Sequence, residues 1–78
     1  MKIRFFASLK DHFGEEMIVA DPSLKSIEDL AVFLAHLKPE AEGILQKCKY
    51  AINNKFVSKE MAMLDIEEVL IMPPSSGG

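Results

Sequence analysis

Alternating apolar and polar positions predict a strand at each end of the chain. Ile3 and Phe5 share one face of a predicted strand over residues 3–7, and that face is expected to point toward the core. Phe6 is an aromatic residue on the other face, whose remaining members are charged. Residues 68–72 predict a last strand with apolar residues on both faces. Both strands are therefore apolar enough to lie at the centre of a sheet.

A helical repeat of apolar residues lies between these two strands. Ser26 suits the N-cap position, and Asp29 follows it three residues later in a capping-box arrangement. Pro39 ends the repeat. The predicted apolar stripe consists of Ile27, Leu30, Ala31, Leu34 and Leu37. This spacing predicts the main helix of the protein.

Shorter elements complete the pattern. The predicted set is a short helix over 8–13 that stops at Gly14, a strand over 16–20, a helical segment over 40–47 with Ile44 and Leu45 inward, and a hairpin of strands 50–52 and 56–57 around Asn53-Asn54-Lys55. One main helix packed across a mixed sheet of about five strands is an α+β fold. Pro73-Pro74 stops further pairing, because proline has no N–H to donate. We therefore expect a domain over residues 1–74 and a flexible tail over 75–78.

Length and charge narrow the class of protein. The 78 residues allow one domain, and an apolar content of 49% is typical of a globular protein. No signal peptide is visible, and no apolar run approaches the roughly 20 residues that span a membrane. We therefore expect a soluble cytoplasmic protein without a membrane partner. The net charge of −3 and the absence of a basic stripe argue against nucleic acid as a partner. The small acidic groups indicate either a solvated surface or an acidic face for a basic partner.

Groups for catalysis are scarce. His12 and His36 are far apart and form no zinc-ligand spacing, so no metal site is predicted. Cys48 is the single cysteine, which excludes an intramolecular disulfide and fits a reducing compartment. Its neighbours Lys47 and Lys49 would lower its pKa, whereas a half-buried, inert thiol is the alternative. No glycine-rich phosphate loop is present. The chain is therefore not expected to act as an enzyme on its own or to hold a cofactor.

The Gly77-Gly78 terminus is the unusual feature. Without Cβ atoms, these residues pass through a narrow channel and adopt backbone angles closed to other residues. Gly78 is the last residue of this sequence, so we expect its terminal carboxylate to be free. A frayed end without a role is the alternative.

These ends carry a resemblance to a known family. Ile3-Arg4-Phe5-Phe6-Ala7 with Leu9-Lys10 and Gly14, together with Val69-Leu70-Ile71-Met72-Pro73-Pro74-Ser75-Ser76-Gly77-Gly78, resembles the two ends of the small, sulfur-carrying subunits of molybdopterin synthase. The capped helix, Ala51-Ile52-Asn53 and Phe56-Val57 also fit, so the resemblance covers essentially the whole chain. It implies a ubiquitin-like β-grasp fold.

The resemblance also implies a mechanism and partners. An E1-like adenylyltransferase would consume ATP to adenylate Gly78, and sulfur from a persulfide donor would then displace AMP to give a thiocarboxylate. The large, catalytic synthase subunit would accept the Gly77-Gly78 tail, and two such carriers would supply the dithiolene sulfurs of molybdopterin. Phe6, Phe56 and Met72 match family positions that contact the large subunit in a heterotetramer. A small second core is the alternative role of these three residues.

One departure and three rival functions stand beside this resemblance. The family commonly has a Gly-Asp turn before the last strand, where this chain has Ile66-Glu67, so a different turn is expected. The rivals are the sulfur carrier of thiamine biosynthesis, a ubiquitin-like protein modifier, and an interaction domain with an idle tail. The thiamine carriers usually lack the Phe-Phe-Ala opening and the two prolines before the tail.

Overall fold

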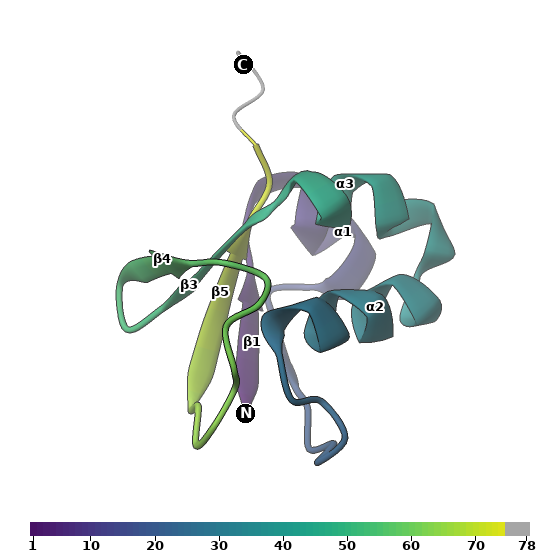
Figure 1. Ribbon diagram of the computed structural model, residues 1–78. Coiled ribbons are helices and arrows are strands. Elements are labelled where there is room, and N and C mark those ends of the chain that lie inside the picture. The colour runs from purple at the N-terminus through teal and green to yellow at the C-terminus, as the bar shows by residue number, and fades with distance from the viewer. Residues whose placement is uncertain (75–78) are drawn as a thin grey trace.

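A five-stranded mixed sheet carries its helices on one face (Figure 1). The computed structural model describes residues 1–74. The strands are β1 (Lys2–Phe5), β2 (Glu16–Ile18), β3 (Lys49–Ile52), β4 (Lys55–Val57) and β5 (Glu68–Met72). The helices are η1 (Ala7–Leu9), α1 (Lys10–Phe13), α2 (Ile27–Leu37), η2 (Pro39–Ala41) and α3 (Glu42–Lys47), of which η1 and η2 are 3-10 helices. The predicted α+β class with one main helix is confirmed.

The first and last strands lie side by side at the centre of the sheet. The strand order is β2-β1-β5-β3-β4, and β1 pairs with β5 in parallel, with Phe5 beside Ile71. The other pairs are antiparallel. This arrangement confirms the central positions that the apolar pattern of both strands predicts.

The core lies between the sheet and α2. Ile3, Phe5, Val69 and Ile71 of the central strands are buried there. Ile27, Leu30 and Leu34 of α2 are fully buried against them, as the predicted stripe requires, and Ala31 is half-buried. The prediction for Leu37 is wrong, since this side chain is 48% exposed. The chain leaves the helix at Lys38, and the buried Ala41 of η2 takes the next inward position.

Local hydrogen bonds fix the ends of two helices. The Asp29 N–H donates to Ser26 Oγ at 3.1 Å, which confirms Ser26 as the N-cap of α2. The Asp29 carboxylate accepts from the N–H of Lys25 at 2.9 Å, one residue before the cap. Gly14 ends α1 with φ +81° and ψ −172°, a region that is almost restricted to glycine. These contacts set the directions in which the chain enters α2 and leaves α1.

Residues with a left-handed backbone conformation form the turn between β3 and β4 and the turn before β5. Asn53 and Asn54 have φ of 53° and 64°, the type I′ geometry that suits a two-residue hairpin between β3 and β4. Before β5, the residue with positive φ is Asp65 at 53°, not Ile66. Aspartate tolerates this region better than a β-branched residue does. The turn before Glu68 therefore differs from the common one as expected, because its left-handed residue is Asp65, one position before Ile66.

Candidate functional site

The end of β5 brings the C-terminal segment to the edge of the domain. β5 ends at Met72, Pro73 is half-buried, and Pro74 is exposed. Pro73 and Pro74 line a surface groove with Ile44 and Lys47 of α3, at the same end of the sheet as that helix (Figure 1). Gly77 and Gly78, the predicted reactive end, lie outside the described residues. The sheet therefore fixes the position of Pro73 and Pro74, from which the chain continues toward Gly77 and Gly78.

Phe6 and Met72 are neighbours on the sheet face opposite the helices, which we call the outer sheet face. The Phe6 N–H donates to the carbonyl of Ile71 at 3.2 Å, which extends the parallel pairing of β1 and β5 by one residue. Since Phe5 lies beside Ile71 in this register, Phe6 lies beside Met72. Both side chains are half-buried and belong to no core cluster. The structure thus brings two of the three predicted contact residues together.

Phe56 lies on the same face but farther from the root of the tail. It is paired with Ala51 across the β3–β4 hairpin and is 66% exposed. Ala51 in turn pairs with Leu70 of β5, so Ala51 and Leu70 connect Phe56 to the Phe6–Met72 pair. Neither Ala51 nor Leu70 was predicted from the sequence as part of this site. Leu70 was detectable, because it lies two residues before Met72 on a strand and therefore shares its face.

Two cations stack on the aromatic residues of the outer sheet face. The Arg4 guanidinium carbon is 5.7 Å from the centre of the Phe6 ring, and the Lys49 ammonium is 5.3 Å from the centre of the Phe56 ring. Such contacts are favourable and orient the cation over the ring face. Within residues 1–74, neither cation has a carboxylate within 4.0 Å. The apolar patch is therefore flanked by positive charge, which suits a partner with acidic groups around an apolar centre.

Cys48 is a buried thiol without the features of a nucleophile. Its Sγ donates to the carbonyl of Ile44 at 3.1 Å, and burial raises the pKa of Cys48 to about 11. The positive charge of Lys59 opposes this shift without cancelling it. The burial and the raised pKa agree with the inert interpretation of Cys48, whereas the expected lowering of its pKa by Lys47 and Lys49 is wrong. The low dielectric around the thiol outweighs the charges of nearby lysines.

The two histidines lie apart from this face. His12 Nδ1 is 4.0 Å from the Glu40 carboxylate, and His36 lies on the exposed side of α2.

Among residues 1–74, no group of three or more His, Cys, Asp or Glu side chains is arranged to hold a metal ion. In that same part of the chain, no helix is long and apolar enough to cross a membrane. The candidate site therefore consists of the outer sheet face and the root of the tail.

Comparisons with known proteins find a family and relatives that match nearly the whole chain. Residues 3–78 match the ThiS family. A molybdopterin synthase sulfur carrier subunit from Dictyostelium discoideum is 28% identical over 81 residues, which cover 99% of this chain and 94% of that protein. A subunit of the same name from Chlamydomonas reinhardtii is also 28% identical over 81 residues, with 100% and 98% covered.

The fold is also found in a solved structure. The crystal structure of SAMP1 from Haloferax volcanii superposes with a TM-score of 0.78 over 99% of this chain and 97% of that chain. The sequence identity is 19%, so this likeness concerns the fold alone. The predicted ubiquitin-like β-grasp fold is confirmed.

Proposed function

Because this chain belongs to the ThiS family, we propose that it is a sulfur carrier of molybdopterin synthesis whose reactive group is the carboxylate of Gly78. One observation carries this proposal: two proteins named as molybdopterin synthase sulfur carrier subunits match the chain over essentially its whole length. The matched region includes the Gly77-Gly78 end.

The proposed chemistry needs no catalytic group from the carrier. A carboxylate is a poor electrophile, so an E1-like adenylyltransferase uses ATP to convert Gly78 into an acyl-adenylate with release of pyrophosphate. The outer sulfur of a persulfide donor then displaces AMP and forms an acyl disulfide with the carrier. A second thiol reduces this bond by forming a disulfide with the donor sulfur, and the carrier leaves with a thiocarboxylate. The large synthase subunit transfers this sulfur to the cyclic pterin precursor. The high pKa of the Cys48 thiol supports a carrier that uses no thiol of its own.

The geometry of the tail root supports delivery into a buried site. Six residues from Pro73 to Gly78 span at most about 20 Å when extended. They continue from β5, which β1 and β3 hold on both sides. A partner that binds next to this root can therefore receive the terminal carboxylate without unfolding the domain.

The outer sheet face is the proposed docking surface for the large subunit. Phe6 and Met72 lie next to the tail root, and Leu70 and Ala51 extend the apolar patch toward Phe56. Aromatic residues at the centre of an interface commonly contribute much of its binding energy.

Mass spectrometry of the protein from its native cell tests the reaction. A carrier contains molecules in which one oxygen of the C-terminal carboxylate is replaced by sulfur. In a Cys48→Ala variant the chain has no thiol, so alkylation by iodoacetamide reports the thiocarboxylate alone. Absence of the sulfur form in actively growing cells contradicts the proposal.

Identification of the partner tests the pathway. Copurification with a large molybdopterin synthase subunit supports the proposal. Copurification with a thiamine-synthesis enzyme instead assigns the same chemistry to the other pathway, and isopeptide-linked conjugates indicate a protein modifier. We place this chemistry in the cytoplasm, where a reducing environment preserves the Cys48 thiol.

A further inference from the structure

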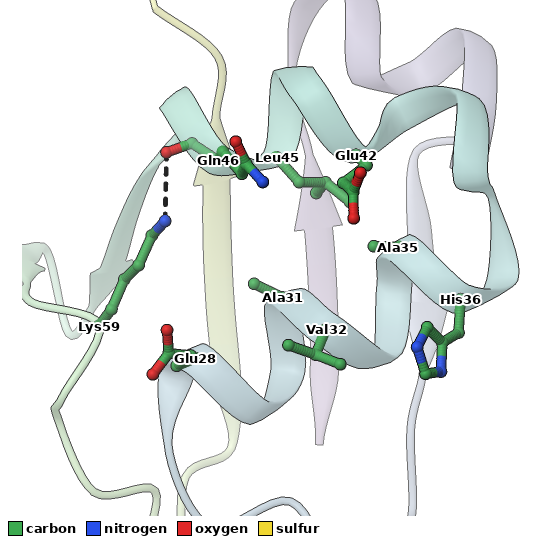
Figure 2. Close-up of a pocket in the computed structure, with 9 residues that line it drawn as sticks. All are labelled: Glu28, Ala31, Val32, Ala35, His36, Glu42, Leu45, Gln46 and Lys59. Carbon is green, nitrogen blue, oxygen red and sulfur yellow. Dashed lines mark hydrogen bonds between the residues drawn. The ribbon is translucent and has the colours of Figure 1, made fainter.

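A groove between α2 and α3 opens on the helical layer, away from the outer sheet face (Figure 2). We call it the α2–α3 groove. Its apolar floor consists of Ala31, Val32, Ala35 and Leu45. The space is about 150 Å³, below the roughly 300–1,000 Å³ of sites that enclose small organic ligands. It therefore suits one long side chain rather than a cofactor.

Small residues keep this groove open. Ala31 and Ala35 lie one turn apart on α2, and both contribute to the floor beneath α3 (Figure 2). Val32, the neighbouring apolar residue, is 50% exposed, although it lies outside the stripe that faces the core. The helical layer thus presents apolar surface that the fold itself does not cover.

Two carboxylates border the floor from opposite sides. Glu28 lies in the first turn of α2 and Glu42 in the first turn of α3 (Figure 2). Within residues 1–74, neither carboxylate has a cation within 4.0 Å. Lys59 also lines the groove, but its Nζ donates to the backbone carbonyl of Gln46 at 3.1 Å. The groove therefore combines an apolar floor with two carboxylates that are free of ion pairs and one ammonium, which is held at the Gln46 carbonyl, and His36 completes its lining.

We propose that the α2–α3 groove binds a Lys or Arg side chain of a partner polypeptide. These side chains carry an apolar stem and a cationic head, and they commonly lay the stem on apolar surface. Here the stem would cover Ala31, Ala35 and Leu45, and the head would meet one of the two carboxylates at the border of the floor. Because the groove lies on the helical layer, it would remain accessible while the outer sheet face is occupied. Neither the tail nor the outer sheet face takes part, so this site is independent of the proposed sulfur chemistry.

Peptide pools with one fixed central residue test the chemical class of the ligand. Five immobilised pools of capped octapeptides carry Lys, Arg, citrulline, norleucine or Glu at the centre, with uncharged residues elsewhere. Biolayer interferometry with the full chain should give at least about tenfold tighter binding to the Lys and Arg pools than to the other three. Amide chemical shifts measured with the best peptide should change at Ala31, Ala35 and Leu45.

Matched variants separate the groove from the overall charge. Glu28→Gln with Glu42→Gln keeps the shape of both side chains and removes two charges, and it should abolish the preference for Lys and Arg. Asp11→Asn with Glu67→Gln removes the same charge from exposed positions outside the groove, and it should bind like the unaltered protein. Ala35→Leu should block binding by filling the floor. Thermal unfolding of each variant confirms that the fold is intact, and the isosteric pair decides the matter if Ala35→Leu does not fold.

Three outcomes overturn the assignment. Equal losses in both double variants would mean that the acidic protein attracts cations without a site. Equal binding of the norleucine and Lys pools would mean that the groove selects apolar side chains only. Binding that shifts amides of the outer sheet face and leaves Ala31, Ala35 and Leu45 unchanged would place the ligand elsewhere.

Discussion

The Arg4 guanidinium lies over the ring of Phe6 on the outer sheet face, 5.7 Å from its centre. The ring is half-buried and stays outside the core, where Ile3 and Phe5 of the same strand are fully enclosed. A half-buried aromatic residue beside a cation, next to the root of the tail, has the character of an interface residue. This relationship leads to the first prediction.

Phe6→Ala should weaken binding to the large synthase subunit by at least about tenfold, or about 1.4 kcal/mol. The isolated domain should lose less than about 1 kcal/mol of stability, because the ring lies outside the core. Titration calorimetry and urea unfolding measure the two effects. Ile3→Ala is the matched control on the same strand, and the cavity it leaves should cost about 2–5 kcal/mol of stability. Equal destabilisation by both variants would show that Phe6 is a core residue.

Deletion of Gly78, or Gly77→Val, should abolish adenylation and leave folding unchanged. The buried residues of β5 end at Ile71, so we expect the stability of the domain not to depend on the last two residues. ATP–pyrophosphate exchange with the activating enzyme measures adenylation, and thermal unfolding measures stability. Ser75→Ala changes the same segment without changing the Gly-Gly end, so it should retain exchange. Normal exchange by the truncated protein would place the reactive group elsewhere.

The thiol of Cys48 should react slowly at neutral pH. Burial raises its pKa from 9.0 to about 11, so its thiolate fraction at pH 8 is about a hundredfold lower than that of an exposed cysteine. Iodoacetamide should therefore alkylate Cys48 about a hundredfold more slowly than the exposed thiol of a Cys48→Ala/Ser58→Cys variant. Comparable rates for both would show that the native site is open to solvent. Sulfur transfer by Cys48→Ala should stay near the unaltered rate.

The same shift predicts how stability changes at alkaline pH. Between about pH 9 and pH 11 the thiol ionises in the unfolded chain but stays protonated in the native state. The native state then binds more protons, so the free energy of unfolding decreases as pH rises through this range. Burial also raises the pKa of Tyr50, and this shift lowers the stability at alkaline pH in the unaltered protein and in a Cys48→Ala variant alike. Urea unfolding at a series of pH values should therefore show that the free energy of unfolding decreases less with pH in Cys48→Ala than in the unaltered protein. The same decrease in both proteins would contradict the raised pKa of Cys48.

Two glycines should respond to alanine with opposite signs. Gly14 ends α1 at φ +81° and ψ −172°, so Gly14→Ala should cost about 1–3 kcal/mol through backbone strain. Gly43 lies in α3, and a Cβ added there would meet no other part of the structure within 4 Å, so Gly43→Ala should stabilise the protein by about 0.5–1 kcal/mol. Thermal unfolding of the two variants measures both effects. A loss of stability in Gly43→Ala would show that α3 needs the flexibility of glycine.

Local patterns predict much of this fold because the decisive interactions lie close in sequence. The alternation around Ile3 and Phe5 determines which face of β1 is buried, and Ser26 caps α2 through a residue three positions away. The exposure of Leu37 could not be predicted in this way, because the path of the chain after Lys38 decides whether its side chain is covered. The left-handed position before β5 falls on Asp65 for a similar reason, because tertiary pairing selects the register of the turn.

The candidate site was only partly predictable. Phe6 and Met72 were found because each stands on a strand whose inner face is assigned by its neighbours. The connection to Phe56 through Ala51 and Leu70 depends on the pairing of β3 with β5, which the sequence does not specify. The stacked cations and the α2–α3 groove join segments that are near in sequence, but they depend on side-chain placement and helix packing that the apolar pattern does not specify. The pKa of Cys48 follows from its surroundings in space rather than from its lysine neighbours.

The central position of β5 has a consequence for the order of assembly. In a chain made from its N-terminus, β1 is synthesised early but has its parallel partner only when Glu68–Met72 have been made. Contacts between such distant segments make folding slower than it is for proteins with local contacts. A product cut short before β5 would lack the middle strand of its sheet and expose Ile3 and Phe5 to proteases and chaperones. Cellular quality control would thus remove carriers that lack the segment leading to the tail.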